Sequence, residues 1–161
     1  MKTEILCAEG ALTVRRFREG DLPELAALLA DPEVMRWLEP PFDRAWAAEF
    51  LRAAGLSEPP LIYAAEEDGA FLGYVIFHRY GDEDAAELGW VLRRSAWGRG
   101  YAGRLTALLL SAAEGKYAQA VIECAPEQRA SARVAEKLGF REEGMADGCR
   151  IFRRTVSRDG T

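Results

Sequence analysis

Cysteine and histidine are scarce in this chain. Its 161 residues include three cysteines, Cys7, Cys124 and Cys149, and a single histidine, His78. An odd number of scattered cysteines does not suit the disulfide framework of a small secreted domain. One histidine and three separated cysteines also supply too few ligands for a zinc site. We therefore predict a cytoplasmic protein without a metal.

Long hydrophobic runs and an excess of positive charge are missing as well. No apolar run approaches the roughly 20 residues that a membrane-spanning helix needs. The first ten residues, MKTEILCAEG, carry a charge within their short apolar region, unlike a signal peptide. The net charge of −5 argues against a nucleic-acid partner, because phosphate binding favours a basic surface. These features predict a protein that contacts neither membranes nor nucleic acids.

Hydrophobic periodicity along the chain predicts one mixed α/β (α+β) domain spanning residues 1–161. Asp21 is expected to cap the first helix, and Asp68-Gly69 to form a hairpin turn. The tail over 157–161 is short and polar, and we expect it to be loose. The expected order is β-α-α-α-β-β-β-α-β-α-β-β, with strands at 12–17, 60–68, 70–80, 85–93, 118–124, 139–144 and 148–156, and helices at 22–30, 31–38, 43–55, 101–114 and 128–138.

A glycine-rich stretch, SAWGRGYAGRL, precedes the helix at 101–114. Gly98, Gly100 and Gly103 have the G-x-G-x-x-G spacing of a dinucleotide-binding turn, and Glu123 lies where a ribose-binding acid would be expected. However, the five residues RRSAW separate GWVL from Gly98, and the motif comes late in the chain. A dinucleotide is therefore the less favoured ligand.

The same stretch suits any pyrophosphate. Glycines free the backbone amides to turn inward, and the helix start adds unpaired N–H groups and the positive end of its dipole. Arg99 and Arg104 are placed to add charge-assisted contacts. Coenzyme A carries a pyrophosphate, so it is an alternative ligand. A third interpretation, in which the glycines only shorten a strand-to-helix connection, requires fewer of them.

Two segments together resemble a known family. ELGWVLRRSAWGRGYAGRLTALLL, followed by APEQRASARVAEKLGFREEG, is similar to the GNAT superfamily of acyl-CoA-dependent N-acetyltransferases. Within it, the branch that contains the ribosomal-protein N-terminal acetyltransferases is the most similar. The resemblance implies a mostly antiparallel sheet of about seven strands with helices on both faces. It also implies transfer of an acetyl group from acetyl-CoA to an amine, directly within a ternary complex.

The resemblance also assigns roles to individual residues. Glu87 is the first choice for the general base, Glu123 the second, and Ser131 is expected to approach the coenzyme sulfur. His78 lies at a strand end and is interpreted as incidental. Residues expected to bind the coenzyme are Val91, Leu92 and Arg93 beside pantetheine, Gly98, Arg99, Gly100, Tyr101, Ala102 and Gly103 at the pyrophosphate, and Gln128 and Ser131 on the next helix.

Three positions depart from the family pattern. Ser95 replaces the usual Gln or Arg of the loop, and Gln128 replaces the usual Asn. Ala135 stands where many members have a tyrosine that protonates the leaving thiolate, so that acid is missing. These departures support an alternative in which the chain binds acyl-CoA without transferring the acyl group.

The acceptor is not determined by the sequence. A protein N-terminus and a small-molecule amine are both compatible with it, as are a monomer and a homodimer. An aromatic stripe at helical spacing is either an acceptor pocket or core, and we favour core. The acidic residues beside Pro40-Pro41 either attract an ammonium group or are simply solvated. The stripe consists of Met35, Trp37, Phe42 and Trp46, and the acidic residues are Glu39 and Asp43.

Overall fold

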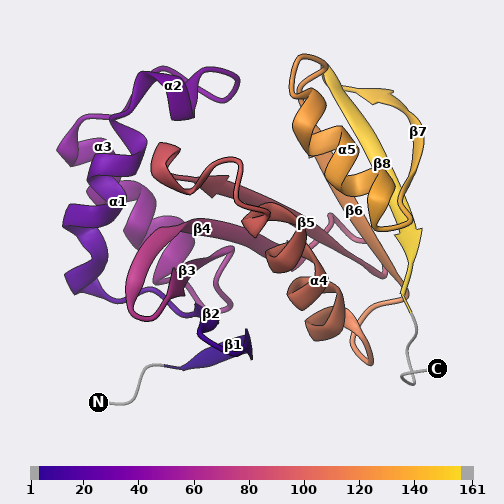
Figure 1. The fold of residues 1–161 in the computed structure, drawn as a ribbon, viewed down its shortest axis with the longest axis horizontal. Coiled ribbons are helices and arrows are strands. Elements are labelled where there is room, and N and C mark those ends of the chain that lie inside the picture. Colours follow the sequence, from indigo (N-terminus) through magenta and orange to yellow (C-terminus); the bar gives the residue numbers. More distant parts are fainter. Residues whose placement is uncertain (1–3, 157–161) are drawn as a thin grey trace.

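The backbone forms one open, eight-stranded sheet (Figure 1). The computed structural model describes residues 4–156. The strand order is β1-β2-β3-β4-β5-β6-β8-β7, and every neighbouring pair is antiparallel except β5 and β6. The strands are β1 (Ile5–Glu9), β2 (Leu12–Arg15), β3 (Ile62–Glu67), β4 (Ala70–Arg79), β5 (Ala85–Leu92), β6 (Gln119–Cys124), β7 (Arg141–Ala146) and β8 (Cys149–Thr155).

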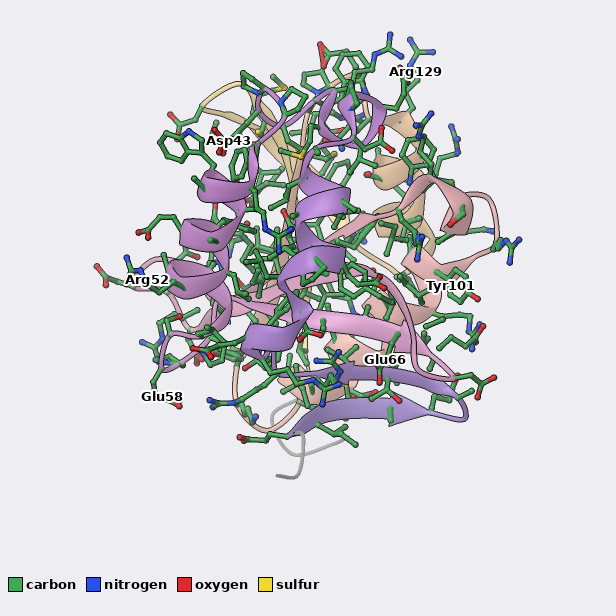
Figure 2. All side chains as sticks on the ribbon, turned by 90° about the vertical axis from the view of Figure 1, so that its left-hand side faces the viewer. Asp43, Arg52, Glu58, Glu66, Tyr101 and Arg129 are labelled. Carbon is green, nitrogen blue, oxygen red and sulfur yellow. The ribbon has the colours of Figure 1, made fainter. Side chains whose placement is uncertain are left out.

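Helices cover both faces of the sheet, as predicted. One face packs against α1 (Leu22–Leu29), α2 (Pro32–Met35) and α3 (Arg44–Phe50), which η2 (Leu51–Gly55) extends by a π-helical turn. The other packs against α4 (Tyr101–Ala113) and α5 (Arg129–Lys137). In Figure 2 the viewer faces α1 and α3. Asp43 lies at the start of α3, and Arg52 lies in η2, which extends that helix. Two 3₁₀ turns, η1 (Glu19–Asp21) and η3 (Arg94–Ala96), complete the helical elements of the described chain.

Strand alternation divides the apolar residues into two cores. Leu88 of β5 packs with α4 and α5, whereas Val91 of the same strand packs with α1 to α3. Successive side chains of a strand point to opposite faces, so β5 belongs to both cores. This central strand is therefore held from two sides.

β5 and β6 separate soon after they meet. Their parallel ladder pairs Ala85 with Gln119, Ala86 with Ala120 and Glu87 with Val121. β5 continues to Leu92 without further pairing to β6, while its antiparallel ladder with β4 extends from Ala86 to Leu92. The two strands therefore diverge from Glu87 onward, beneath the start of α4.

The sequence prediction of about seven strands missed β1. Ile5–Glu9 pairs with β2 across a turn at Gly10, which has a φ of +60°. Glu4 precedes this short strand and Glu9 ends it, so its alternation is weak. The predicted Asp68-Gly69 hairpin is confirmed, and both residues have positive φ.

The predicted cap at Asp21 was wrong. No side-chain cap bond is found at the start of α1; instead Asp21 lies buried against Arg15 of β2, with 2.8 and 2.9 Å between their charged atoms. Arg15 also donates to Glu66 of β3 at 3.1 Å. The carboxylate thus ties the turn before α1 to the sheet.

The strand predicted at 148–156 lies inside the sheet. β8 lies between β6 and β7, so β7, whose six residues are all exposed, forms the edge. Two arginines of β8 pair with acidic neighbours. Arg150 bonds to Glu142, and Arg153 bonds to Glu143 and Glu83.

Three further observations concern the described residues. The three cysteines are free thiols. Residues 4–156 contain no helix with both the length and the apolar character to cross a bilayer. The same residues contain no group of three or more His, Cys, Asp or Glu side chains arranged to hold a metal ion.

The buried Arg15–Asp21 pair generates a stability prediction. Asp21→Asn leaves the Arg15 charge with only Glu66, and breaking a buried pair typically costs 3–5 kcal/mol. We expect a loss of about 3 kcal/mol, at the lower end of that range because Glu66 remains. Urea denaturation at pH 7 measures this loss. Glu49→Gln, which breaks the exposed Arg52–Glu49 pair, is the control and should change nothing measurable.

The same pair makes stability depend on pH. Burial alone would raise the pKa of Asp21, but bonds from Arg15 and the Arg18 backbone outweigh it and hold that pKa below its usual range. Its contribution is therefore present above the unfolded-state pKa of about 4 and is lost as the pH falls below it. Wild type should lose more stability than Asp21→Asn between pH 6 and 3. Equal losses would contradict this account.

Candidate active site

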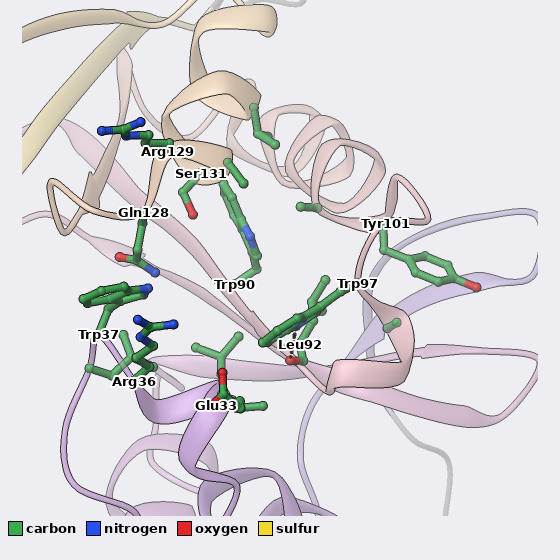
Figure 3. Close-up of a pocket in the computed structure, with 18 of the residues that line it drawn as sticks. Glu33, Arg36, Trp37, Trp90, Leu92, Trp97, Tyr101, Gln128, Arg129 and Ser131 are labelled. Atoms are coloured by element: carbon green, nitrogen blue, oxygen red, sulfur yellow. Dashed lines mark hydrogen bonds between the residues drawn. The ribbon is translucent and has the colours of Figure 1, made fainter.

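A cavity of about 590 Å³ lies where β5 leaves β6 (Figure 3). Three segments form its walls: α2 with the turn after it, the end of β5 with the loop into α4, and the start of α5. Figure 3 shows Trp90, Leu92 and Trp97 on one side and Gln128 and Ser131 on another. The full lining is Glu33, Val34, Arg36, Trp37, Leu38, Trp90, Val91, Leu92, Ala96, Trp97, Gly98, Gly100, Tyr101, Ala102, Gly103, Glu127, Gln128, Arg129, Ala130, Ser131 and Val134.

The glycine loop forms an anion cradle at one end of this cavity. Gly98 and Gly100 have φ of +72° and +80°, in the left-handed region that glycine adopts most easily. A Cβ at either position would meet nothing within 4 Å, so conformation rather than crowding requires these glycines. α4 starts directly after Gly100, and the amides of its first turn have no partner within the helix. These donors and the helix dipole favour an anion.

The end of β5 is fixed by the loop. The Trp97 indole Nε1 donates to the Leu92 carbonyl oxygen at 2.9 Å (Figure 3). Of the three residues expected beside pantetheine, Val91 and Leu92 line the cavity and Arg93 does not. Its backbone N–H donates to Leu72, and its guanidinium donates to the Phe71 carbonyl. Arg93 and Ser95 instead line a second cavity of about 570 Å³ beside α1.

The predicted carboxylates lie on the α1–α3 face of the sheet, outside the cavity lining. Glu87 is partly buried and is the last β5 residue paired with β6. Burial raises its pKa, His78 lowers it in part, and the Glu123 charge raises it further. Glu123 accepts a 2.5 Å bond from the Tyr80 hydroxyl, which raises the pKa of Tyr80 to about 12.

Comparison with known proteins identifies the family. A family model described as an acetyltransferase (GNAT) domain matches residues 11–141. The chain belongs to the GNAT acetyltransferase family. The prediction from the two sequence segments is therefore confirmed, and the protein is an acetyl-CoA-dependent N-acetyltransferase.

Individual relatives agree with this assignment. An uncharacterized N-acetyltransferase of Bacillus subtilis, YnaD, is 27% identical over 144 residues, which cover 86% of this chain and 84% of YnaD. Two solved structures share the fold. RimL, a ribosomal L7/L12 alpha-N-protein acetyltransferase in complex with coenzyme A, is 22% identical with a TM-score of 0.82, covering 97% of this chain and 100% of RimL. The spermidine N-acetyltransferase of Vibrio cholerae, in complex with coenzyme A and spermine, is 19% identical with a TM-score of 0.77, covering 92% and 97%.

The cavity of this acetyltransferase suits the co-substrate. The cradle before α4 would hold the pyrophosphate, and the unpaired edge of β5 after Glu87 would lie along pantetheine. Gly98, Gly100, Tyr101, Ala102 and Gly103 line the cavity, whereas Arg99 does not. Bound acetyl-CoA supplies the acetyl group as an activated thioester.

The side chains of Tyr101 and Arg104, at the start of α4, make contacts with another strand. The Tyr101 phenol donates to Glu67 of β3 and points away from Trp90 and Ser131 (Figure 3). Arg104 lies over the Tyr101 ring at 5.6 Å and 3.4 Å from the same carboxylate. Glu67 therefore anchors the start of α4 and already neutralises Arg104.

The α5 wall explains two departures from the family pattern. Gln128 precedes α5 and accepts a bond from the Ala125 N–H at 2.8 Å, so its amide oxygen stabilises its own turn. Ser131 lies in the first turn of α5 and lines the cavity. Ala135 is fully buried in the core. Its side chain offers no acid to the cavity.

The aromatic stripe divides into core and cavity residues. Met35 is buried, and Phe42 packs edge-on against Phe50 at 5.9 Å, as the core interpretation predicted. Trp37 instead lines the cavity beneath the Arg36 guanidinium at 4.6 Å, and Trp46 is exposed.

The two acidic residues beside Pro40-Pro41 have different surroundings. Asp43 caps α3 by accepting from the Trp46 N–H, and Glu39 is exposed.

Sequence reasoning missed Glu33 and Arg36 of the α2 wall, favoured core for Trp37, and missed both tryptophans of the β5 side. Glu33, Arg36 and Trp37 come from a segment that carries no motif. Trp97, by contrast, precedes Gly98 directly, so its place in the glycine loop was a usable signal.

The cradle generates a binding prediction. Gly100→Ala places a side chain in a left-handed conformation at a cost of roughly 1–2 kcal/mol, which the loop relieves by turning its amides. We expect coenzyme A to bind about tenfold more weakly, equivalent to about 1.4 kcal/mol. Isothermal titration calorimetry with coenzyme A measures this change.

Gly10→Ala is the matched control. Gly10 also has a positive φ and open space around it, but it lies in the β1–β2 turn outside the cavity. This variant should lose similar stability and bind coenzyme A normally. Wild-type affinity in Gly100→Ala, or equal weakening in both variants, would contradict the cradle.

Proposed function

We propose that this acetyltransferase acts on a primary amine and transfers the acetyl group directly within a ternary complex. Glu87 serves as general base, and Ser131 contacts the coenzyme sulfur. The observation that carries this proposal is the end of the β5–β6 ladder at Glu87. Glu87 therefore lies where β5 and β6 begin to diverge. We take the gap between the two strands to lead from this point to the cavity.

Glu87 suits the task better than Glu123. An amine must lose a proton to attack a thioester, and a base with a raised pKa accepts that proton more readily. Burial raises the pKa of Glu87 while leaving the side chain partly accessible. Glu123 lies on the same face, but Tyr80 already donates to one of its oxygens.

Direct transfer is supported by the state of the cysteine on β6, one of the two strands that border the gap. Cys124 ends β6 and is buried, and burial raises the pKa of its thiol. A buried thiol at neutral pH is a poor nucleophile, because the thiolate is the reactive form. An acyl-enzyme on Cys124 is therefore disfavoured.

Ser131 is the polar side chain best placed to meet the leaving sulfur. It lines the cavity from the first turn of α5, and Ala135 one turn later is apolar. A thiolate is a comparatively stable leaving group, so contact from a hydroxyl suffices where no stronger acid is present.

The acceptor is a protein N-terminus or a small-molecule amine. The name of RimL describes an alpha-N-protein acetyltransferase, and the Vibrio cholerae relative is named for spermidine. Both acceptors present an amine, which is the shared chemistry. Exposed Trp37 and Trp46 are available to contact the rest of either acceptor.

Glu87→Gln tests the base. Removing a general base typically lowers the rate by about 10²–10⁴-fold. We expect kcat/KM for the amine to fall within this range, with unchanged binding of coenzyme A. Release of thiol from acetyl-CoA, with peptides bearing free N-termini, polyamines and aminoglycosides as acceptors, measures the rate.

Glu9→Gln, on exposed β1, is the matched control and should retain wild-type activity. In wild type, kcat/KM should fall as the pH drops through the raised pKa of Glu87, because the protonated carboxyl accepts no proton. Full activity in Glu87→Gln would rule out this base. Binding of coenzyme A without turnover of any amine would favour a binding module instead.

A further inference from the structure

His78 of β4 and Glu87 of β5 lie side by side on adjacent strands. They are direct partners in the antiparallel ladder of β4 and β5, so their side chains share one face of the sheet. His78 Nε2 lies 3.6 Å from Glu87 Oε1, and both side chains are about three-quarters buried, with exposures of 26% and 23%. The sequence interpretation of His78 as incidental did not consider this contact.

The other imidazole nitrogen fixes the tautomer. His78 Nδ1 lies 2.8 Å from the Arg79 carbonyl oxygen. A carbonyl oxygen only accepts hydrogen bonds, so Nδ1 must carry the proton. In the neutral ring Nε2 is then the basic nitrogen, and it is directed toward Glu87.

The surroundings of the pair are acidic. Glu123 acts on Glu87 from β6, and Tyr80, directly after β4, is bonded to Glu123. Arg153 of β8 is already paired with Glu83 and Glu143. Cys149 of β8 lies near Glu87, Glu123 and Asp147 and remains a thiol, with its pKa raised mainly by burial. His78 lowers the pKa of Glu87, whereas Glu123 raises it.

We propose that His78 is the positioning residue for Glu87, and that the two side chains share one proton on the path from the acceptor amine to solvent. This inference rests on the proposed role of Glu87. With Nδ1 held by Arg79, Nε2 receives the proton that Glu87 accepts, and the carboxylate is restored. Transfer forms the C–N bond, breaks the C–S bond, leaves one proton on the thiol and releases one to solvent.

The tautomer and the pairing are measurable without any activity. Because the chain has one histidine, its imidazole nitrogens give a single ¹⁵N-detected set. We expect the Nδ1–H tautomer at high pH. Glu87→Gln removes the carboxylate oxygen that lies 3.6 Å from Nε2, so the Nε2 signal should shift in this variant, whereas Glu9→Gln should leave it unchanged.

Kinetics test the functional coupling. His78→Gln removes the side chain that lowers the pKa of Glu87, so the acid limb of kcat/KM should move to higher pH. His78→Phe should move it in the same direction. In the Glu87→Gln background, adding His78→Gln should cause less than a twofold further loss, because residues acting through one another are not additive.

The outcomes separate the two proposals. An Nε2–H tautomer, or the same Nε2 signal in wild type and Glu87→Gln, overturns the pairing whatever the activity. An unmoved acid limb or additive losses in the double variant overturn the positioning role. If wild type acetylates no amine, the proposed function fails, and the nitrogen spectra still decide whether the pair exists. Thermal unfolding of each variant identifies a loss of activity that comes from misfolding.

Discussion

The short parallel contact between β5 and β6 determines the rest of the site. Only three residue pairs join the strands, and they diverge from Glu87 onward. Buried backbone N–H and C=O groups need partners, so the free edge of β5 favours a ligand that can hydrogen-bond like a strand. Trp97 already bonds the Leu92 carbonyl at the far end of this edge. The divergence thus produces both an opening in the sheet and a row of backbone groups along it.

Rigidity around this opening comes from the two cores. β5 packs on α4 and α5 through one set of side chains and on α1 to α3 through the other. The start of α4 is further tied to β3 by Tyr101 and Glu67. A cradle built from backbone amides depends on such support, because a small rotation of the helix would turn all of its donors together.

Much of this arrangement could be predicted from the sequence, for local reasons. Gly98 and Gly100 mark a left-handed turn at a helix start, and Asp68-Gly69 marks a tight hairpin, because these conformations limit which residues fit. The role of Asp21 could not be predicted, because an aspartate before a helix suits a cap as well as an ion pair with a distant arginine. The contact of His78 with Glu87 required the register of β4 and β5. The length of the loop over residues 80–84 does not by itself fix that register. A shift of one residue would turn one of the two side chains to the opposite face of the sheet.

The distribution of tryptophan has an optical consequence. Three of the four tryptophans, Trp37, Trp90 and Trp97, line one cavity, and they come from α2, β5 and the loop before α4. The intrinsic fluorescence of the protein therefore originates largely from the walls of its site. Displacement of water from those walls by a bound molecule changes the polarity around most of the emitting indoles at once. The chain thus carries its own spectroscopic reporter of occupancy, with no label added.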